Sequence, residues 1–126
     1  FNLVLISEGF DAGNTAPPGW TFTSISTYTS TGNFGEKSPS LSFNASNDRI
    51  IVPLPAGATA TGMTFWTRGQ SIQGNSFLSI TGVVVNGTTT TQIQIARLDG
   101  VSAIPNAALT HVVPLSASNL VELQFH

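Results

Sequence analysis

Alternation of apolar and polar residues with a period of two dominates this chain and predicts β-strands. In residues 63–68, Met63 and Phe65 fall on one side of an extended backbone, whereas Trp66 and Arg68 fall on the other. No stretch of helical length shows a 3.6-residue period that is free of Gly, Pro and β-branched residues. The pattern therefore predicts an all-β protein.

Segments rich in Gly, Pro, Asn and Ser separate the expected strands. Residues 2–6 are apolar enough to form a strand buried on both faces, residues 26–36 are typical of a loop, and Asn86-Gly87 is typical of a type I′ hairpin turn. Short strands at this spacing predict an antiparallel two-sheet β-sandwich, jelly-roll-like, in a single domain over residues 1–126. The expected strands cover residues 2–6, 20–25, 41–43, 49–52, 63–68, 77–85, 90–97, 111–115 and 120–126.

Composition narrows the class of protein. Only 8% of the 126 residues are charged, against roughly 25% in an average soluble protein, and Thr, Ser, Asn and Gly fill the polar positions. This composition indicates a secreted or cell-surface module. Because the chain has no cysteine, such a module must rely on core packing, calcium or assembly instead of disulfides. The chain starts at Phe1 without a Met or a basic leader region, which indicates a signal-cleaved product or an excised domain.

The charge pattern argues against two kinds of partner. The formal net charge is −2, and the four Lys and Arg residues are scattered along the chain, whereas nucleic-acid binding needs clustered positive charge. No apolar run approaches the length that spans a bilayer, so we expect no membrane insertion.

Several short motifs follow one another in an order that resembles a known family. They are SEGFDAG and PPGW near the start, then GNFGEKSPSLSFNASNDRIIVP, MTFWTRGQ, GNSFLSI and NLVELQFH. In this order they resemble the choice-of-anchor J and cleaved-adhesin domains, β-sandwich modules of secreted and surface proteins in Bacteroidetes-type bacteria. The resemblance implies a module that binds or assembles and does not catalyse. It also implies a further strand after residues 120–126, so we expect a domain that lacks its final C-terminal strand and exposes a sheet edge.

Candidate catalytic groups form no recognisable set. His111 and His126 lie in separate expected strands, and no nucleophile elbow accompanies them. The carboxylates of Glu36, Asp48 and Glu122 lie in unrelated segments and do not form the pair that glycoside hydrolysis requires. We therefore expect no enzymatic activity.

Acidic residues beside the first expected strand suit calcium better than catalysis. Ca²⁺ prefers six to eight oxygen ligands from carboxylates, backbone carbonyls and amides. Glu8 and Asp11 supply carboxylates, and Asn33 lies in a Gly-rich loop, residues 32–38, whose carbonyl oxygens are further candidate ligands. The resemblance implies a structural calcium at the Glu8 position, together with a late aspartate that this chain lacks. The alternative is that Glu8 and Asp11 cap a turn.

Strand parity also gathers candidate ligand-binding residues. Trp66 and Arg68 share a side, and amide side chains stand opposite the apolar positions of two later strands. If these strands share a sheet, one outer face carries an indole, a guanidinium and several amides, which is the chemistry that recognises a sugar. The alternative is that a loop containing Tyr28 covers Trp66. The expected ligand-binding residues are Trp66, Arg68, Gln70, Gln92, Gln94 and Gln124.

Two functions from different classes follow. The first is a non-catalytic extracellular recognition module, adhesin-like, which binds a glycan or another cell-surface ligand and is stabilised by calcium. The second is a structural subunit of an extracellular filament or surface layer. In that case an apolar strand of one subunit would complete the open sheet edge of the next.

Overall fold

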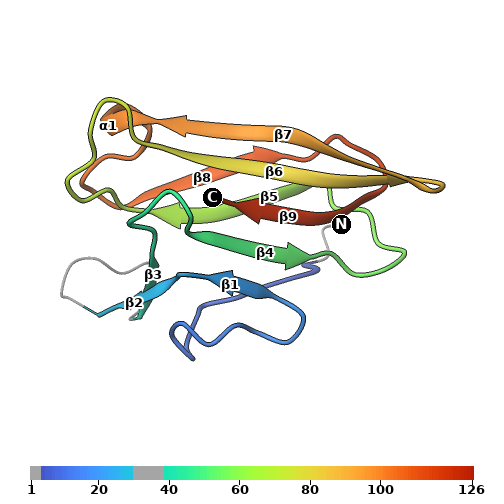
Figure 1. Ribbon diagram of the computed structural model, residues 1–126, viewed down its shortest axis with the longest axis horizontal. Coiled ribbons are helices and arrows are strands. Elements are labelled where there is room, and N and C mark those ends of the chain that lie inside the picture. The colour runs from blue at the N-terminus through green and yellow to red at the C-terminus, as the bar shows by residue number, and fades with distance from the viewer. Residues whose placement is uncertain (1–3, 30–38) are drawn as a thin grey trace.

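The computed structural model describes residues 4–29 and 39–126, and nearly all of its regular elements are antiparallel β-strands (Figure 1). This confirms the all-β prediction. The elements, in chain order, are β1 (Thr21–Thr23), β2 (Ser26–Tyr28), β3 (Ser40–Ser42), β4 (Arg49–Pro53), β5 (Gly62–Thr67), β6 (Phe77–Asn86), β7 (Thr89–Asp99), the short helix α1 (Gly100–Ala103), β8 (Leu109–Pro114) and β9 (Leu120–Phe125).

One five-stranded sheet organises the described chain. Its order is β1-β4-β9-β6-β7, so β9, which is last in the sequence, lies at its centre and pairs with both β4 and β6. Two further pairs, β2–β3 and β5–β8, form separate two-stranded sheets. Most of the strand neighbours are distant in sequence, and β6–β7 is the hairpin that joins sequential strands of the large sheet.

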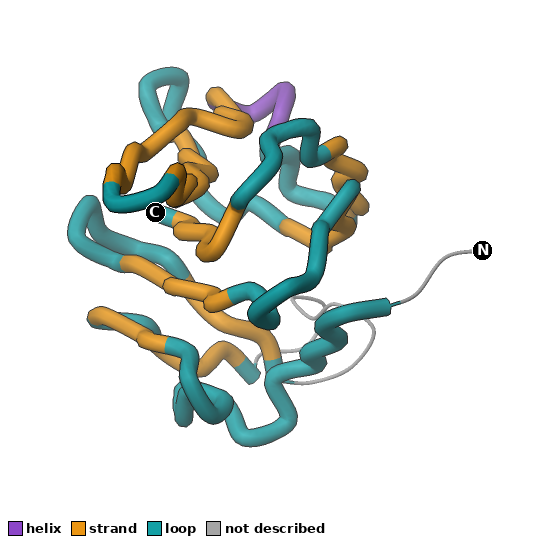
Figure 2. The backbone as a smooth tube through the Cα atoms, turned by 90° about the vertical axis from the view of Figure 1, so that its right-hand side faces the viewer, coloured by secondary structure: helices purple, strands orange, loops and turns teal. Residues whose placement is uncertain are grey.

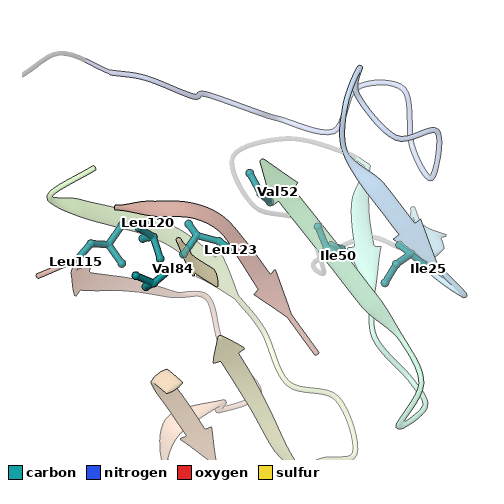
Figure 3. Close-up of a cluster of buried hydrophobic side chains, with 7 residues drawn as sticks. All are labelled: Ile25, Ile50, Val52, Val84, Leu115, Leu120 and Leu123. Atoms are coloured by element: carbon teal, nitrogen blue, oxygen red, sulfur yellow. The ribbon is translucent and has the colours of Figure 1, made fainter. Parts of the chain in front are cut away.

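The apolar core lies on one side of the five-stranded sheet. Ile80, at the centre of β6, is completely buried. The β5–β8 pair packs on this same side, because Phe65 of β5 meets Phe125 of β9 edge-on with ring centroids 5.5 Å apart. The buried cluster drawn in Figure 3 consists of Ile25, Ile50, Val52, Val84, Leu115, Leu120 and Leu123.

Gly82 of β6 shows how tightly this side is packed. A Cβ atom there would lie 2.6 Å from Leu120 Cδ1 and 2.7 Å from Ile95 Cδ1. Two side chains therefore fill the space above the glycine, and any larger residue would displace them.

The start of the chain differs from the prediction of a buried strand. Within residues 4–6, no strand forms, Val4 is 73% exposed, and Leu5 is also exposed. The segment runs outside the sheets (Figure 2), and only Ile6 packs against the core. Apolar character alone does not make a strand, because the backbone also needs a hydrogen-bonding partner. Residues 2 and 3 of the predicted strand lie outside the described residues.

Two further segments, a predicted loop and a predicted turn, differ in detail from the structure. β2 lies within the segment predicted as a loop, and its polar residues pair with β3 in the register Ser26↔Ser42. The β6–β7 hairpin is confirmed, but its two-residue loop consists of Gly87 and Thr88. Gly87 has φ 62° and Thr88 is not among the residues with positive φ, which fits a type II′ turn instead of type I′. No helix in the described part of the chain is long and apolar enough to cross a membrane.

Candidate functional site

The residues expected to form one sugar-binding face lie on two different sheets. Trp66 belongs to β5, which pairs with β8, whereas Gln92 and Gln94 of β7 and Gln124 of β9 belong to the five-stranded sheet. The condition for a single sugar-binding face, that these strands share a sheet, is therefore not met. Sequence parity assigned the correct side of each strand, but parity carries no information about which strands pair.

We call the outward side of the five-stranded sheet around these glutamines the amide face; it comprises Thr81, Gln92, Gln94, Glu122 and Gln124. The pairings Thr81↔Gln94 and Thr81↔Gln124 place three of them in one row, and Val83 separates Gln92 from Glu122 in the next. Gln124 Nε2 donates a hydrogen bond to Glu122 Oε2 at 2.8 Å. The amide face is a polar patch interrupted by Val83, in which Gln92 and Gln94 are exposed and Gln124 is only 7% exposed.

An arginine at one end of the amide face is also neutralised. Arg97 Nε donates to Asp99 Oδ1 at 2.8 Å, and its guanidinium carbon lies 3.8 Å from the centre of the Phe77 ring. The carboxylate of Asp99 compensates the positive charge of this guanidinium, and the Phe77 ring covers one of its flat sides.

A second surface is built around Trp66 on the β5–β8 pair. Because Phe65 points inward to Phe125, Trp66 points outward. It pairs across the sheet with Thr110, and Thr64 pairs with Val112, which is 75% exposed. We call this surface the indole face, and it comprises Thr64, Trp66, Arg68, Asn106, Thr110 and Val112.

Local packing holds Arg68 at the end of the indole face. Arg68 Nε donates to Asn106 Oδ1 at 3.1 Å. The next residue, Gly69, donates its backbone N–H to Pro105 O at 2.8 Å. A Cβ at Gly69 would lie 2.3 Å from Ile104 O, so only glycine allows the two backbones to come this close. Arg68 is therefore anchored through both its side chain and its neighbour.

Gln70 lies just beyond Arg68 and contacts β2. The Tyr28 hydroxyl donates a hydrogen bond to Gln70 Oε1 at 3.2 Å. Tyr28 therefore lies beside the last predicted ligand residue of this segment. Residues 30–38 of the loop expected to cover Trp66 lie outside the described residues. Trp66 itself is half-buried, so part of the indole stays accessible.

Sequence reasoning missed Asn106 and Thr110 as members of the site. Thr110 is outward on β8 by the same parity as Trp66 on β5, but only the β5–β8 pairing brings the two together. Asn106 lies in the loop between α1 and β8, and its sequence context contains no signal for the contact with Arg68.

The two histidines contact threonine hydroxyls. His111 stacks on Phe65 with ring centroids 5.0 Å apart, and its Nε2 lies 2.7 Å from Thr67 Oγ1. His126 Nε2 lies 3.0 Å from Thr81 Oγ1. Burial lowers the pKa of both imidazoles, and the positive charge of Arg49 lowers the pKa of His126 further.

The residues expected to bind calcium are described only in part. Glu8 Oε1 accepts a hydrogen bond from the Phe10 backbone N–H at 2.6 Å, and Phe10 has φ 58°, so Glu8 does cap a tight turn. Asp11 follows in this turn, and Asn33 lies outside the described residues. Within residues 4–29 and 39–126, no three His, Cys, Asp or Glu side chains gather as a metal cluster. One carboxylate oxygen of Glu8 is thus already engaged by the backbone.

Comparison of this chain with protein-family models, with curated proteins and with solved structures finds no match. The resemblance to choice-of-anchor J and cleaved-adhesin domains therefore depends on the order of the motifs alone.

Proposed function

We propose that this chain is a non-catalytic extracellular recognition module that binds a glycan through its indole face. The observation that carries the proposal is the outward, half-buried Trp66, with Thr110 opposite it and the Arg68–Asn106 pair beyond it. A pyranose ring presents an apolar C–H face that stacks on an indole. Hydroxyl, amide and guanidinium groups around the ring then bind the sugar hydroxyls.

Glycan-array and affinity-gel binding of the wild type and of Trp66→Ala test this proposal. We expect the variant to lose binding, because the apolar platform is removed. Phe77→Ala is the matched control, since Phe77 is an aromatic residue of the five-stranded sheet and is 49% exposed. Equal binding by wild type and Trp66→Ala, or no glycan bound by the wild type, would remove the glycan role.

The finer architecture belongs to the same proposal. A jelly-roll-like sandwich, with β5–β8 in the second layer, is supported by the Phe65–Phe125 contact and by Met63 and Leu115 packing against the core. Membership of the choice-of-anchor J or cleaved-adhesin type, and a secreted or cell-surface location, are supported by the motif order and the low charge.

Calcium stabilisation through Glu8, Asp11 and Asn33 is the second part of the proposal. An ion that binds only the folded chain stabilises it by about 3 kcal/mol at a hundredfold excess over Kd. Chelation should then lower the melting temperature by several degrees, and Glu8→Ala should remove the difference between calcium and chelator. Superimposable wild-type melting curves with and without chelator would leave Glu8 as a turn cap alone.

One observation favours the alternative function of a filament subunit. In the described part of the chain, β7 pairs only with β6, which leaves its other edge open. β7 also lines a groove of about 120 Å³, where Ile93 and Ile95 meet Leu115 and Leu120 together with the polar residues Gln94 and Ser116. The segment of a second copy that contains Val4 and Leu5, both exposed and apolar, is the candidate occupant. Fibres in negative-stain images would support assembly, and a monodisperse monomer by light scattering would contradict it.

A further inference from the structure

Arg68 and Arg97 have different partners. Arg97 is neutralised by Asp99 at 2.8 Å and stacks on Phe77. Arg68 has a neutral partner, the Asn106 side chain, and within residues 4–29 and 39–126 it forms no ion pair. Among those residues its positive charge therefore has no anionic partner, and Arg68 follows the half-buried Trp66 by two positions.

The hydrogen bond to Asn106 engages Nε of the guanidinium and not its two terminal nitrogens. A guanidinium has five N–H donors, and the bond at 3.1 Å uses Nε. The two terminal nitrogens, Nη1 and Nη2, have no hydrogen-bond partner in the described part of the chain. These two nitrogens form a planar fork that matches two oxygens of a carboxylate or a sulfate.

The position of Arg68 relative to Trp66 suits a substituted sugar. Residues two apart in an extended chain lie on the same side, about 7 Å from each other. One sugar unit can therefore stack on Trp66 while a charged substituent on that unit, or on its neighbour, reaches the guanidinium. The anchoring of Arg68 through Asn106 and Gly69 reduces the entropy lost when this contact forms.

We infer that the glycan bound at the indole face is anionic and carries a uronic-acid carboxylate or a sulfate ester that pairs with Arg68. This inference rests on the proposed glycan-binding function and specifies its ligand class.

The test uses an array of neutral, uronate-containing and sulfated oligosaccharides, probed with wild type, Arg68→Gln and Arg97→Gln. We expect the wild type to prefer anionic oligosaccharides and to lose this preference in high salt. Arg68→Gln should weaken that binding at least about tenfold, as expected for the loss of hydrogen bonds to a charged group. Arg97→Gln, which removes an already paired arginine, should bind as the wild type does.

Two further arms identify the anionic group and guard against misfolding. Carboxyl reduction of the uronate oligosaccharides, or desulfation of the sulfated ones, should abolish wild-type binding to whichever class carries the recognised group. Arg68→Lys keeps the charge but loses the fork, so it should bind with intermediate affinity. If Arg68→Gln does not fold, as judged by circular dichroism, these two arms carry the test.

The outcomes separate this inference from the proposed function. A preference for neutral oligosaccharides, or equal weakening of neutral and anionic binding by Arg68→Gln, overturns the anionic ligand and leaves glycan binding intact. No binding to any oligosaccharide overturns both.

Discussion

On the amide face, two of the outward polar groups bond to each other, whereas the indole face combines a partly accessible indole with an arginine that has a neutral partner. Gln124 donates to Glu122 on the five-stranded sheet, and Arg97 nearby pairs with Asp99. On the other surface, Arg68, which follows β5, donates to a neutral amide and forms no ion pair within the described residues, and the indole of Trp66 is half-buried. Both surfaces contain the residue types that bind sugars, and Gln92 and Gln94 of the amide face are exposed. The combination of an accessible aromatic ring with an arginine that lacks an anionic partner in the described part of the chain, more than composition, distinguishes the candidate site from a solvated sheet face.

The largest expected effect is on the free energy of unfolding, which should fall much more for a substitution on the inward side of the five-stranded sheet than for one on its outward side. Ile80 and Thr81 are adjacent in β6, but Ile80 is completely buried, whereas Thr81 belongs to the amide face. We expect Ile80→Ala to reduce the free energy of unfolding by about 3–4 kcal/mol, because it leaves a cavity. Thr81→Ala should cost about 1 kcal/mol, through one lost hydrogen bond. Urea denaturation measures both; equal losses would show that the amide face carries as much stability as the core.

The next effect contrasts two carboxylates. Asp48 is 1% exposed, and its Oδ2 accepts hydrogen bonds from the backbone N–H groups of Asn44 and Ala45 at 2.6 and 3.0 Å. We expect Asp48→Ala to cost about 2–3 kcal/mol of unfolding free energy, because two amides lose their acceptor. Asp99→Ala, at an exposed ion pair, should cost less than about 1 kcal/mol. A greater loss for Asp99 in thermal denaturation would mean that the outward charge network is structural.

A smaller effect concerns pH, because His111 lies on β8 and His126 directly follows β9. His111 lies on the inward side of β5–β8, and His126 lies at the edge of the amide face. Burial lowers the pKa of both in the folded state, so the unfolded chain binds more protons between the folded and unfolded pKa values. Stability should therefore fall as the pH drops from about 7 towards 5.

The control for this pH effect is a pair of single variants, His111→Gln and His126→Gln. Each should reduce the loss of stability at low pH, and the measurement is the melting temperature across the pH range. A melting temperature that rises on acidification would contradict the direction of both pKa shifts.

The smallest expected effect is on glycan binding by the amide face. The double variant Gln92→Ala/Gln94→Ala removes two exposed amides from β7 and leaves the indole face intact. We expect less than a twofold change in affinity for a glycan bound by the wild type. A tenfold loss in isothermal titration calorimetry would assign binding to the amide face and remove the contrast between the two surfaces.

Much of the fold could be predicted from the sequence, because a period of two fixes which side of a strand each residue occupies. Parity predicts that Trp66 and Phe65 lie on opposite sides of β5, and the Asn86-Gly87 dipeptide predicts the hairpin after β6. The partner of each strand could not be predicted, since pairing depends on contacts between residues far apart in the chain. That is why Gln92 and Trp66 were assigned to one face, and why residues 4–6 were expected to form a strand that has no partner in the structure.

The candidate site could be predicted only in its local part. Trp66 and Arg68 follow from alternation within one strand. Thr110 and Asn106 come from segments more than 35 residues away and depend on the β5–β8 register and on the loop after α1. The partner of Arg68, Asn106, and the Phe77 ring beside Arg97 are likewise set by tertiary structure, whereas Asp99 lies only two residues from Arg97 along the chain.

The most direct test of the indole face is an NMR titration that follows the two tryptophan indole N–H signals with an oligosaccharide selected on the array. Trp20 packs against Phe10 and Phe22, with ring centroids 6.0 and 6.4 Å away, and serves as an internal control. We predict that the Trp66 indole signal and the backbone signals of Arg68 and its neighbours shift on binding, while the Trp20 signal stays in place. Shifts confined to β7 and β9, with the Trp66 signal unmoved, would contradict the account.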